Sequence, residues 1–211
     1  MITAATLLNK PEYDPKVRQR CDGAYQFGDR LFGCWFDKGH GEMDLTSAMV
    51  NSCDVYFYKT IHYFDLDELS ESFKAFGFSY PTQVDIFGES VGIVPSTSLM
   101  NEIHGRYGWS KGASLNICIG QGELLVTPIQ VLNYVNLIAT RGNAQIPHFV
   151  RVDQLPENFN PILKSATWET IISDLRKVVT HRKGTGREAQ PNISDLKVFG
   201  KILTPNNLPL D

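Results

Sequence analysis

Three cysteines and one histidine within the first 53 residues have side chains that bind transition metals. Cys21, Cys34, His40 and Cys53 follow the spacing C-x12-C-x5-H-x12-C. Three thiolates and one imidazole are the ligand set of a closed, tetrahedral structural zinc site. The alternatives are ordinary buried thiols beside a surface histidine, or a disulfide pair if the domain is exported. We predict one zinc ion on these four residues, although the sequence has no Cys-x-x-Cys pair.

A serine and an acidic residue flank the last of these cysteines. Ser52-Cys53-Asp54 places a hydroxyl and a carboxylate two positions apart, where both can point into a cleft. A pair of this kind occurs by chance in most chains, and its simplest alternative role is to cap the next helix. The other Cys and His residues show no metal-ligand spacing. Cys118 is expected to lie in the core. The remaining histidines are expected to be structural or exposed: His62, His104, His148 and His181.

Hydrophobic periodicity places Ser52 at a junction between two helices. Apolar residues recur at helical spacing over 44–50, the pattern breaks at Ser52, and an aromatic-rich helix is predicted over 55–64. A further helix follows from residue 66 and ends at Gly77. Residues 11–42 show no sustained period and predict a long irregular segment that needs an internal tie. A metal ion would supply that tie.

The remaining elements are read from caps and periodicity. Thr127-Pro128 with Gln130 forms a capping box and starts a buried helix that ends near residue 142. An amphipathic helix is predicted over 168–179, and strands over 145–152 and 197–203. Residues 1–8 resemble the later turns of a helix, because no capping residue precedes them. The sequence therefore predicts a mostly helical fold with a little sheet near its end.

Composition limits the classes of protein to which the chain can belong. The 211 residues carry 20 Lys and Arg against 23 Asp and Glu, so no basic excess is available to neutralise phosphates, and nucleic acid is an unlikely partner. No run of about 18 apolar residues is present, and the first apolar run is too short for a signal peptide. Without repeats or low-complexity tracts, a single globular domain is expected.

Two long segments resemble the transpeptidase domain of class B penicillin-binding proteins. They are residues 39–58, which contain Ser52-Cys53-Asp54, and residues 119–130, which contain Gly120-Gln121-Gly122. The resemblance extends from Met1 to about Lys201 and is closest to the elongation-specific branch, penicillin-binding protein 2. It implies an α/β (α+β) penicillin-binding/serine β-lactamase-like transpeptidase fold, mostly the helical subdomain with part of the sheet. It also implies a serine D,D-transpeptidase that crosslinks peptidoglycan stem peptides and is acylated by β-lactams.

Such enzymes combine three motifs, of which this sequence matches one in full. Ser52 and Asp54 match the second motif, Ser-x-Asn or Ser-x-Asp. Lys201 matches the Lys of the third motif, but Ile202 follows it where the family has Thr or Ser. The segment 183–186, Lys-Gly-Thr-Gly, looks like that motif only superficially. The first motif, Ser-x-x-Lys, occurs only at 194–197, where a strand should begin, and we interpret it as coincidence.

The resemblance leads to further expectations. The chain is expected to be a partial domain over 1–211, without the N-terminal Ser-x-x-Lys box and the C-terminal strands and helix. Ser52 is expected at the mouth of a cleft, lined by the neighbours of Gly120-Gln121-Gly122 and faced by a strand that bears Lys201. Some penicillin-binding protein 2 relatives carry zinc on residues at the positions of Cys21, Cys34, His40 and Cys53.

The resemblance also implies where the parent protein acts and with what. That parent is expected to be anchored in the inner membrane, to hold this domain in the periplasm and to work with a SEDS-family glycosyltransferase. Two functions stay open: part of a D,D-transpeptidase, or a non-catalytic zinc-stabilised remnant. A zinc hydrolase is disfavoured, because four protein ligands close the metal shell.

Overall fold

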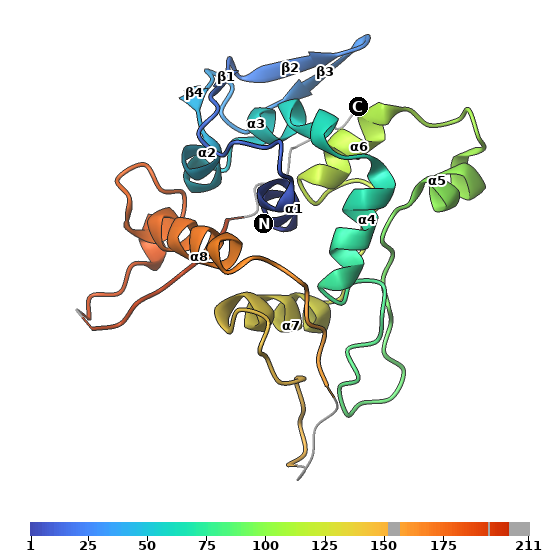
Figure 1. Ribbon diagram of the computed structural model, residues 1–211, viewed down its shortest axis with the longest axis vertical. Helices are drawn as coiled ribbons and strands as arrows, with labels where there is room; N and C mark the ends of the chain where they lie inside the picture. The colour runs from blue at the N-terminus through green and yellow to red at the C-terminus, as the bar shows by residue number, and fades with distance from the viewer. Residues whose placement is uncertain (152–156, 194, 203–211) are drawn as a thin grey trace. The chain divides into compact units, whose positions relative to one another are not determined.

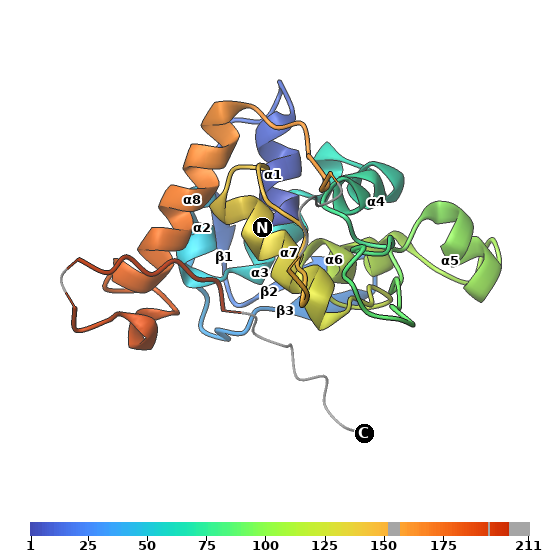
Figure 2. The ribbon, with the colours of Figure 1, turned by 90° about the horizontal axis from the view of Figure 1, so that it is seen from below.

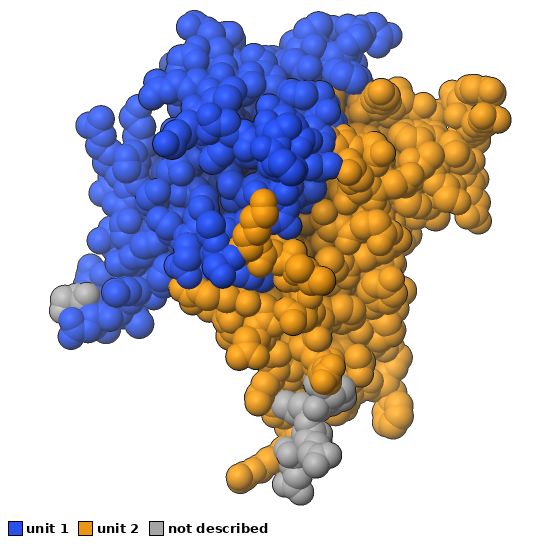
Figure 3. All heavy atoms as spheres, in the orientation of Figure 1, with its two compact units in different colours: residues 1, 3–63, 165–211 blue, residues 2, 64–164 orange. Residues whose placement is uncertain are grey.

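The computed structural model describes residues 1–151, 157–193 and 195–202. The chain forms two compact units, coloured separately in Figure 3: residues 1, 3–63 and 165–211, and residues 2 and 64–164. Figure 1 gives the order of the helices and strands along the chain. None of the helices in the described part of the chain has the length and apolar character that a membrane span requires.

Helix α1, Ile2–Asn9, belongs to the first unit except for Ile2, and it has no side-chain cap, as predicted. Residues 11–42 differ from the prediction of an irregular segment, because they contain four short strands. They pair antiparallel as β1 (Gln19–Cys21) with β4 (Gly41–Met43) and as β2 (Ala24–Phe27) with β3 (Arg30–Gly33). Strands of three or four residues are too short to show an alternating pattern in sequence, which is why periodicity missed them.

Helices α2 and α3 meet at Ser52, as the periodicity predicts. Helix α2, Leu45–Asn51, begins at Asp44, whose side chain accepts the Ser47 N–H in a capping box. Ser52 has φ 52° and ψ 48°, the left-handed conformation that ends a helix. Helix α3, Asp54–Lys59, then begins and is followed by the short 3-10 helix Ile61–Tyr63. The predicted helix over 55–64 is therefore shorter than expected.

Helix α8, Ser165–Thr180, confirms the predicted amphipathic helix and packs on α2 (Figure 2). A 3-10 helix, Arg187–Ala189, follows it. The predicted final strand is wrong for residues 197–202, which form no strand within the described chain, while Leu203 lies outside the described residues. Polar groups of this segment bond α8 instead: the Gly200 N–H donates to the Leu175 carbonyl, and the Val198 carbonyl accepts from Arg176.

Among its described residues, the second unit contains the helices α4 to α7, joined by long irregular segments. Helix α4, Leu66–Ala75, is followed by Gly77 at φ +89°, which confirms the predicted helix end, and α7, Pro128–Ala139, has the predicted capping box. Helices α5, Thr97–His104, and α6, Lys111–Cys118, were not predicted from the sequence.

The predicted strand over 145–152 is wrong for residues 145–151, and Val152 lies outside the described residues. Two of its N–H groups, those of Phe149 and Val150, donate to the carboxylate of Asp85 at 2.7 and 2.6 Å. These two donors are therefore bound to a side chain of the loop after α4 and not to a neighbouring strand.

Candidate functional site

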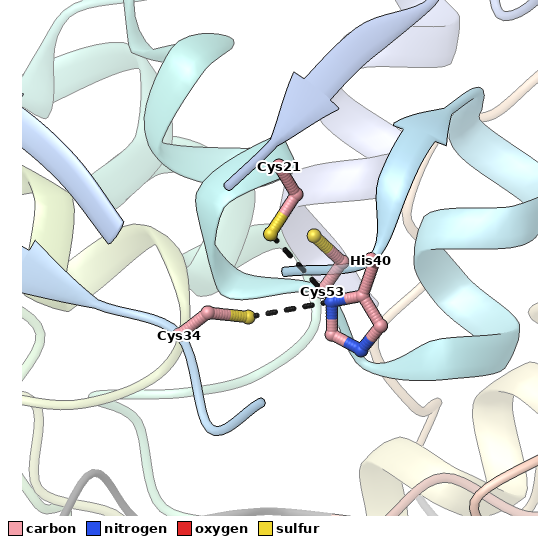
Figure 4. A group of neighbouring side chains, drawn as sticks. All are labelled: Cys21, Cys34, His40 and Cys53. Carbon is pink, nitrogen blue, oxygen red and sulfur yellow. Dashed lines mark hydrogen bonds between the residues drawn. The ribbon is translucent and has the colours of Figure 1, made fainter. Parts of the chain in front are cut away.

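The four predicted metal ligands converge in the first unit, as Figure 4 shows. Cys21 ends β1, Cys34 directly follows β3, His40 directly precedes β4, and Cys53 is the N-cap of α3. Each residue offers one ligand atom, and these atoms all lie within 4.8 Å of one another. The paired strands and the helix junction thus bring together side chains that are up to 32 positions apart in the sequence.

The side chains of this cluster point toward one another. The His40 Nδ1 lies 3.6 Å from the Cys21 Sγ and 3.5 Å from the Cys34 Sγ. The limit of 4.8 Å for the group as a whole is wider than the roughly 4 Å edge of a closed zinc tetrahedron, so the four ligand atoms are gathered but not all at the spacing of bound ligands. No disulfide joins any of the four cysteines, all of which lie in the described chain. The disulfide alternative is therefore absent from this structure.

Burial and proximity favour a thiolate in the cluster. Cys21, Cys34 and Cys53 have side chains that are 1%, 8% and 0% exposed. A hydrogen bond from Cys53 lowers the pKa of the Cys34 thiol to about 3, and the same contact together with burial raises the pKa of Cys53. The Nε2 of His40 is buried and has no hydrogen-bond partner among the described residues. A soft cation would be stabilised by these sulfur and nitrogen donors.

Trp35 joins the cysteine cluster to the helix junction. Its backbone N–H donates to the Asp54 carboxylate at 3.1 Å, and its indole Nε1–H donates to the Asn51 carbonyl at 2.9 Å. Burial raises the pKa of Asp54 to about 7, with a further rise from the nearby Cys34 sulfur, while the Trp35 N–H and the Lys201 charge oppose the rise. Asp54 is thus committed to holding the loop that follows Cys34.

The structure brings Ser52 and Lys201 together from opposite ends of the sequence. The Lys201 Nζ donates to the Ser52 Oγ at 2.5 Å, a direct hydrogen bond through which a proton can be exchanged without a bridging water. Burial lowers the pKa of Lys201 to about 8, and the Asp54 carboxylate opposes that shift. Lys201 also donates to the Ile202 carbonyl at 2.8 Å. An ammonium of this kind is placed to stabilise a negative charge or to exchange a proton with the Ser52 hydroxyl.

Thr185 is a third polar residue at this position, and the sequence analysis missed its role. The Thr185 Oγ1 lies 3.2 Å from the Ser52 Oγ, although the two residues are 133 positions apart. The signal was present in the Lys-Gly-Thr-Gly segment over 183–186, which resembles the third motif. That segment is a loop after α8. Lys201, the residue that matches the third motif in sequence, lies later in the chain, in residues without regular secondary structure.

Other predicted residues are outside this cluster. Gly120-Gln121-Gly122 lies in the second unit, and its expected place in a cleft with Ser52 stays a prediction. Ser194 lies outside the described residues. Cys118 is buried at the end of α6, as expected. His62 contacts the Lys59 carbonyl, and His104 lies 3.3 Å from Glu123, in keeping with the structural roles predicted for both histidines.

Comparison with known proteins gives matches over almost the whole chain. The family model described as the penicillin binding protein transpeptidase domain matches residues 1–201. The peptidoglycan D,D-transpeptidase MrdA of Haemophilus influenzae is 31% identical over 182 residues, which cover 82% of this chain and 28% of that protein.

Solved structures agree with this match. Penicillin-binding protein 2 of Helicobacter pylori superposes with a TM-score of 0.83 at 30% identity, and the match covers 92% of this chain and 37% of that one. A second match is a chain from a structure that describes the coordination of polymerization and crosslinking by a peptidoglycan synthase complex. It superposes with a TM-score of 0.75 at 25% identity, and the match covers 89% of this chain and 32% of that one. The chain therefore spans well under half the length of these relatives.

Proposed function

The chain belongs to the penicillin-binding protein transpeptidase domain family, and on that basis we propose that it forms part of a D,D-transpeptidase site that crosslinks peptidoglycan stem peptides. The observation that carries the proposal is the 2.5 Å contact between the Lys201 Nζ and the Ser52 Oγ. The second and third motifs of the family contain such a serine and such a lysine. Their convergence across 149 positions supports the residue matches made from sequence.

The roles proposed for these residues follow from their chemistry. A serine nucleophile is neutral at pH 7, so acyl transfer requires groups that move its proton and bind the substrate amide. Ser52 would relay a proton through its hydroxyl, and Lys201 would attract the substrate carboxylate. Asp54 would hold the turn through its bond to the Trp35 N–H. The substrates in this proposal are stem peptides that end in D-Ala-D-Ala, and β-lactams are their mimics.

We extend the proposal to a structural zinc ion on Cys21, Cys34, His40 and Cys53. Three buried sulfurs and one imidazole nitrogen lie within 4.8 Å of one another, and the donor set is one that zinc prefers. Zinc would tie the strands β1 to β4 to the start of α3. Because Cys53 lies between Ser52 and Asp54, the same ion would fix the turn that presents Ser52.

The location and partners belong to the same proposal. The parent protein would be anchored in the inner membrane, with this domain in the periplasm. A SEDS-family glycosyltransferase would polymerise the glycan strands that it crosslinks. The match to a chain of a peptidoglycan synthase complex that coordinates polymerization and crosslinking supports this assignment.

A second function is favoured by one sequence feature. Ile202 follows Lys201, so the hydroxyl that the third motif places there is missing. A zinc-stabilised module without turnover of its own would tolerate that change. In this alternative, Cys21, Cys34, His40 and Cys53 keep their role, while Ser52 and Lys201 bind no substrate.

Ligand titration followed by NMR distinguishes the two functions. The 15N-labelled, zinc-loaded chain is titrated with an N-acyl-D-Ala-D-Ala peptide, and the L-Ala-L-Ala isomer serves as the control. The transpeptidase proposal predicts shifts at Ser52 and Lys201 with the D,D isomer only, and their loss in Lys201→Met. Equal shifts with both isomers, or none at these residues, would overturn it and leave the non-catalytic module.

A further inference from the structure

The loop that carries Thr185 is held in place by its backbone. The Thr185 N–H donates to the Val50 carbonyl at 3.2 Å, and the Gly186 N–H donates to the Val178 carbonyl at 3.0 Å. A Cβ on Gly184 would lie 2.2 Å from that same Val178 oxygen, so no larger residue fits there without movement of the loop. The side chain of Thr185 is therefore presented to the end of α2 from a fixed backbone position.

The hydroxyl of Thr185 continues a line of hydrogen bonds that starts at Lys201. The Lys201 ammonium can only donate, so the Ser52 Oγ accepts from it at 2.5 Å. The proton of Ser52 then needs another acceptor, and the Thr185 Oγ1 lies 3.2 Å away. The Thr185 hydroxyl in turn donates to the Val50 carbonyl at 3.5 Å. With a charged lysine, the line has one direction, from Lys201 through Ser52 and Thr185 to Val50.

We propose that Thr185 is a positioning residue that sets the direction in which the Ser52 hydroxyl donates its proton. This inference rests on the proposed role of Ser52 in the transpeptidase site and extends it to a residue that the motif match does not include. A hydroxyl is suited to the task because it both donates and accepts. When Lys201 is neutral, Thr185 donates to Ser52, and Ser52 donates to the amine, so the line reverses without movement of heavy atoms.

The proposal has a consequence for Lys201 that a space-filling role would not have. Without the Thr185 hydroxyl, the Ser52 proton loses its acceptor on the side away from Lys201. The nearest remaining acceptor for the Ser52 proton is the unshared electron pair of a neutral Lys201 amine. The neutral form of Lys201 is therefore favoured. The neutral state also loses its bond from Thr185, but there the Ser52 proton stays bonded to the amine and only its oxygen loses a donor, so the cost is larger in the charged state. We expect this difference to lower the Lys201 titration midpoint by about 0.5 to 1 pH unit.

The test compares variants that keep the shape of Thr185 with variants that keep its hydroxyl. The titration midpoint of Lys201 is measured by NMR of its Cε and Nζ signals, in chains held in one metal state and without ligand. We expect Thr185→Val to lower the midpoint by about 0.5 to 1 unit and Thr185→Ser to restore it. Thr180→Val is the matched control, because the Thr180 hydroxyl donates to the Arg176 carbonyl of its own helix.

Either of two results would overturn the inference. One is an unchanged Lys201 midpoint in folded Thr185→Val, and the other is an equal fall in Thr185→Ser. If Thr185→Val does not fold, Thr185→Ala supplies the same measurement, since it also lacks the hydroxyl. The experiment uses no peptide or β-lactam. A chain that fails to bind D-Ala-D-Ala therefore refutes the proposed function without deciding the role of Thr185.

Discussion

The Thr46 hydroxyl on α2 donates to both carboxylate oxygens of Asp174 on α8, at 3.0 and 3.2 Å. Asp174 is 1% exposed, and its other partner is the Lys177 ammonium at 3.0 Å. A buried carboxylate that loses one of its partners keeps its full cost of burial. The Thr46 hydroxyl is therefore a specific polar link within the pair of helices that supports Ser52.

Thr46→Val should destabilise the chain by about 1 to 3 kcal/mol, because the variant keeps the volume of the side chain and removes one bond to a buried charge. Urea unfolding followed by circular dichroism measures the change. Thr170→Val is the control, since the Thr170 hydroxyl donates to the Ala166 carbonyl of its own helix, α8. A loss for Thr46→Val no larger than that of the control would show that the link contributes nothing.

Cys34→Ser should abolish binding of one zinc per chain. Structural zinc in small modules contributes on the order of 10 kcal/mol, so metal loss should also expose residues 11–42 to proteolysis. Elemental analysis of the purified protein and limited trypsin digestion are the measurements. Cys118→Ser is the matched control, because Cys118 is also buried but lies outside the cluster. Equal zinc content in Cys34→Ser and in the wild-type protein would contradict the proposed zinc site.

Lys201 should make the chain more stable as the pH rises from about 8 to 10.5. Its pKa is lowered from 10.5 to about 8 in the folded state, so the unfolded chain binds the extra proton in this range. The gain is about 3 kcal/mol at most, present in full above the unfolded pKa and absent below the folded one. Unfolding free energies at pH 7.5 and 10.5 test this. Lys201→Met should show a smaller rise, and an identical rise would contradict the shift.

Residues 1–211 should form no covalent adduct with a β-lactam. Acylation needs a serine activated by a lysine in a Ser-x-x-Lys pair at the start of a helix. The only such spacing in this sequence is 194–197, and its described residues, 195–197, are not helical. Intact mass after incubation with labelled penicillin is the measurement. A stoichiometric adduct on Ser52 would contradict its assignment to the second motif, and one on Ser194 would contradict the interpretation of the spacing at 194–197 as coincidence.

The sequence predicted the elements that depend on local signals. The capping box at Thr127 and the helical spacing before Ser52 involve residues within a few positions of one another, and both elements were placed correctly. The strand pairs over 19–43 depend on partners up to 24 positions apart, so local patterns did not show them. The predicted strand at Lys201 failed for the related reason that strand identity requires a neighbouring strand.

In the candidate site too, the contacts that the sequence predicted differ from those that depend on distant packing. Ligand spacing and chemistry were sufficient to group Cys21, Cys34, His40 and Cys53, and the motif match was sufficient to relate Ser52 to Lys201. The contact between Ser52 and Thr185 joins the end of one helix to a loop 133 residues later. The Lys-Gly-Thr-Gly segment over 183–186 draws attention to Thr185 but does not identify Ser52 as its partner, because that pairing depends on the packing of α8 on α2.

The left-handed backbone of Ser52 bears on why a serine is found there at all. At φ 52°, a residue with a Cβ costs about 1 to 2 kcal/mol, which glycine avoids. If helix termination were the only demand on this position, glycine would serve it better. What a serine adds at this position is the hydroxyl that accepts from Lys201. Ser52→Gly should therefore relieve the backbone of the helix junction while it removes that acceptor, so the two effects can be separated at one residue.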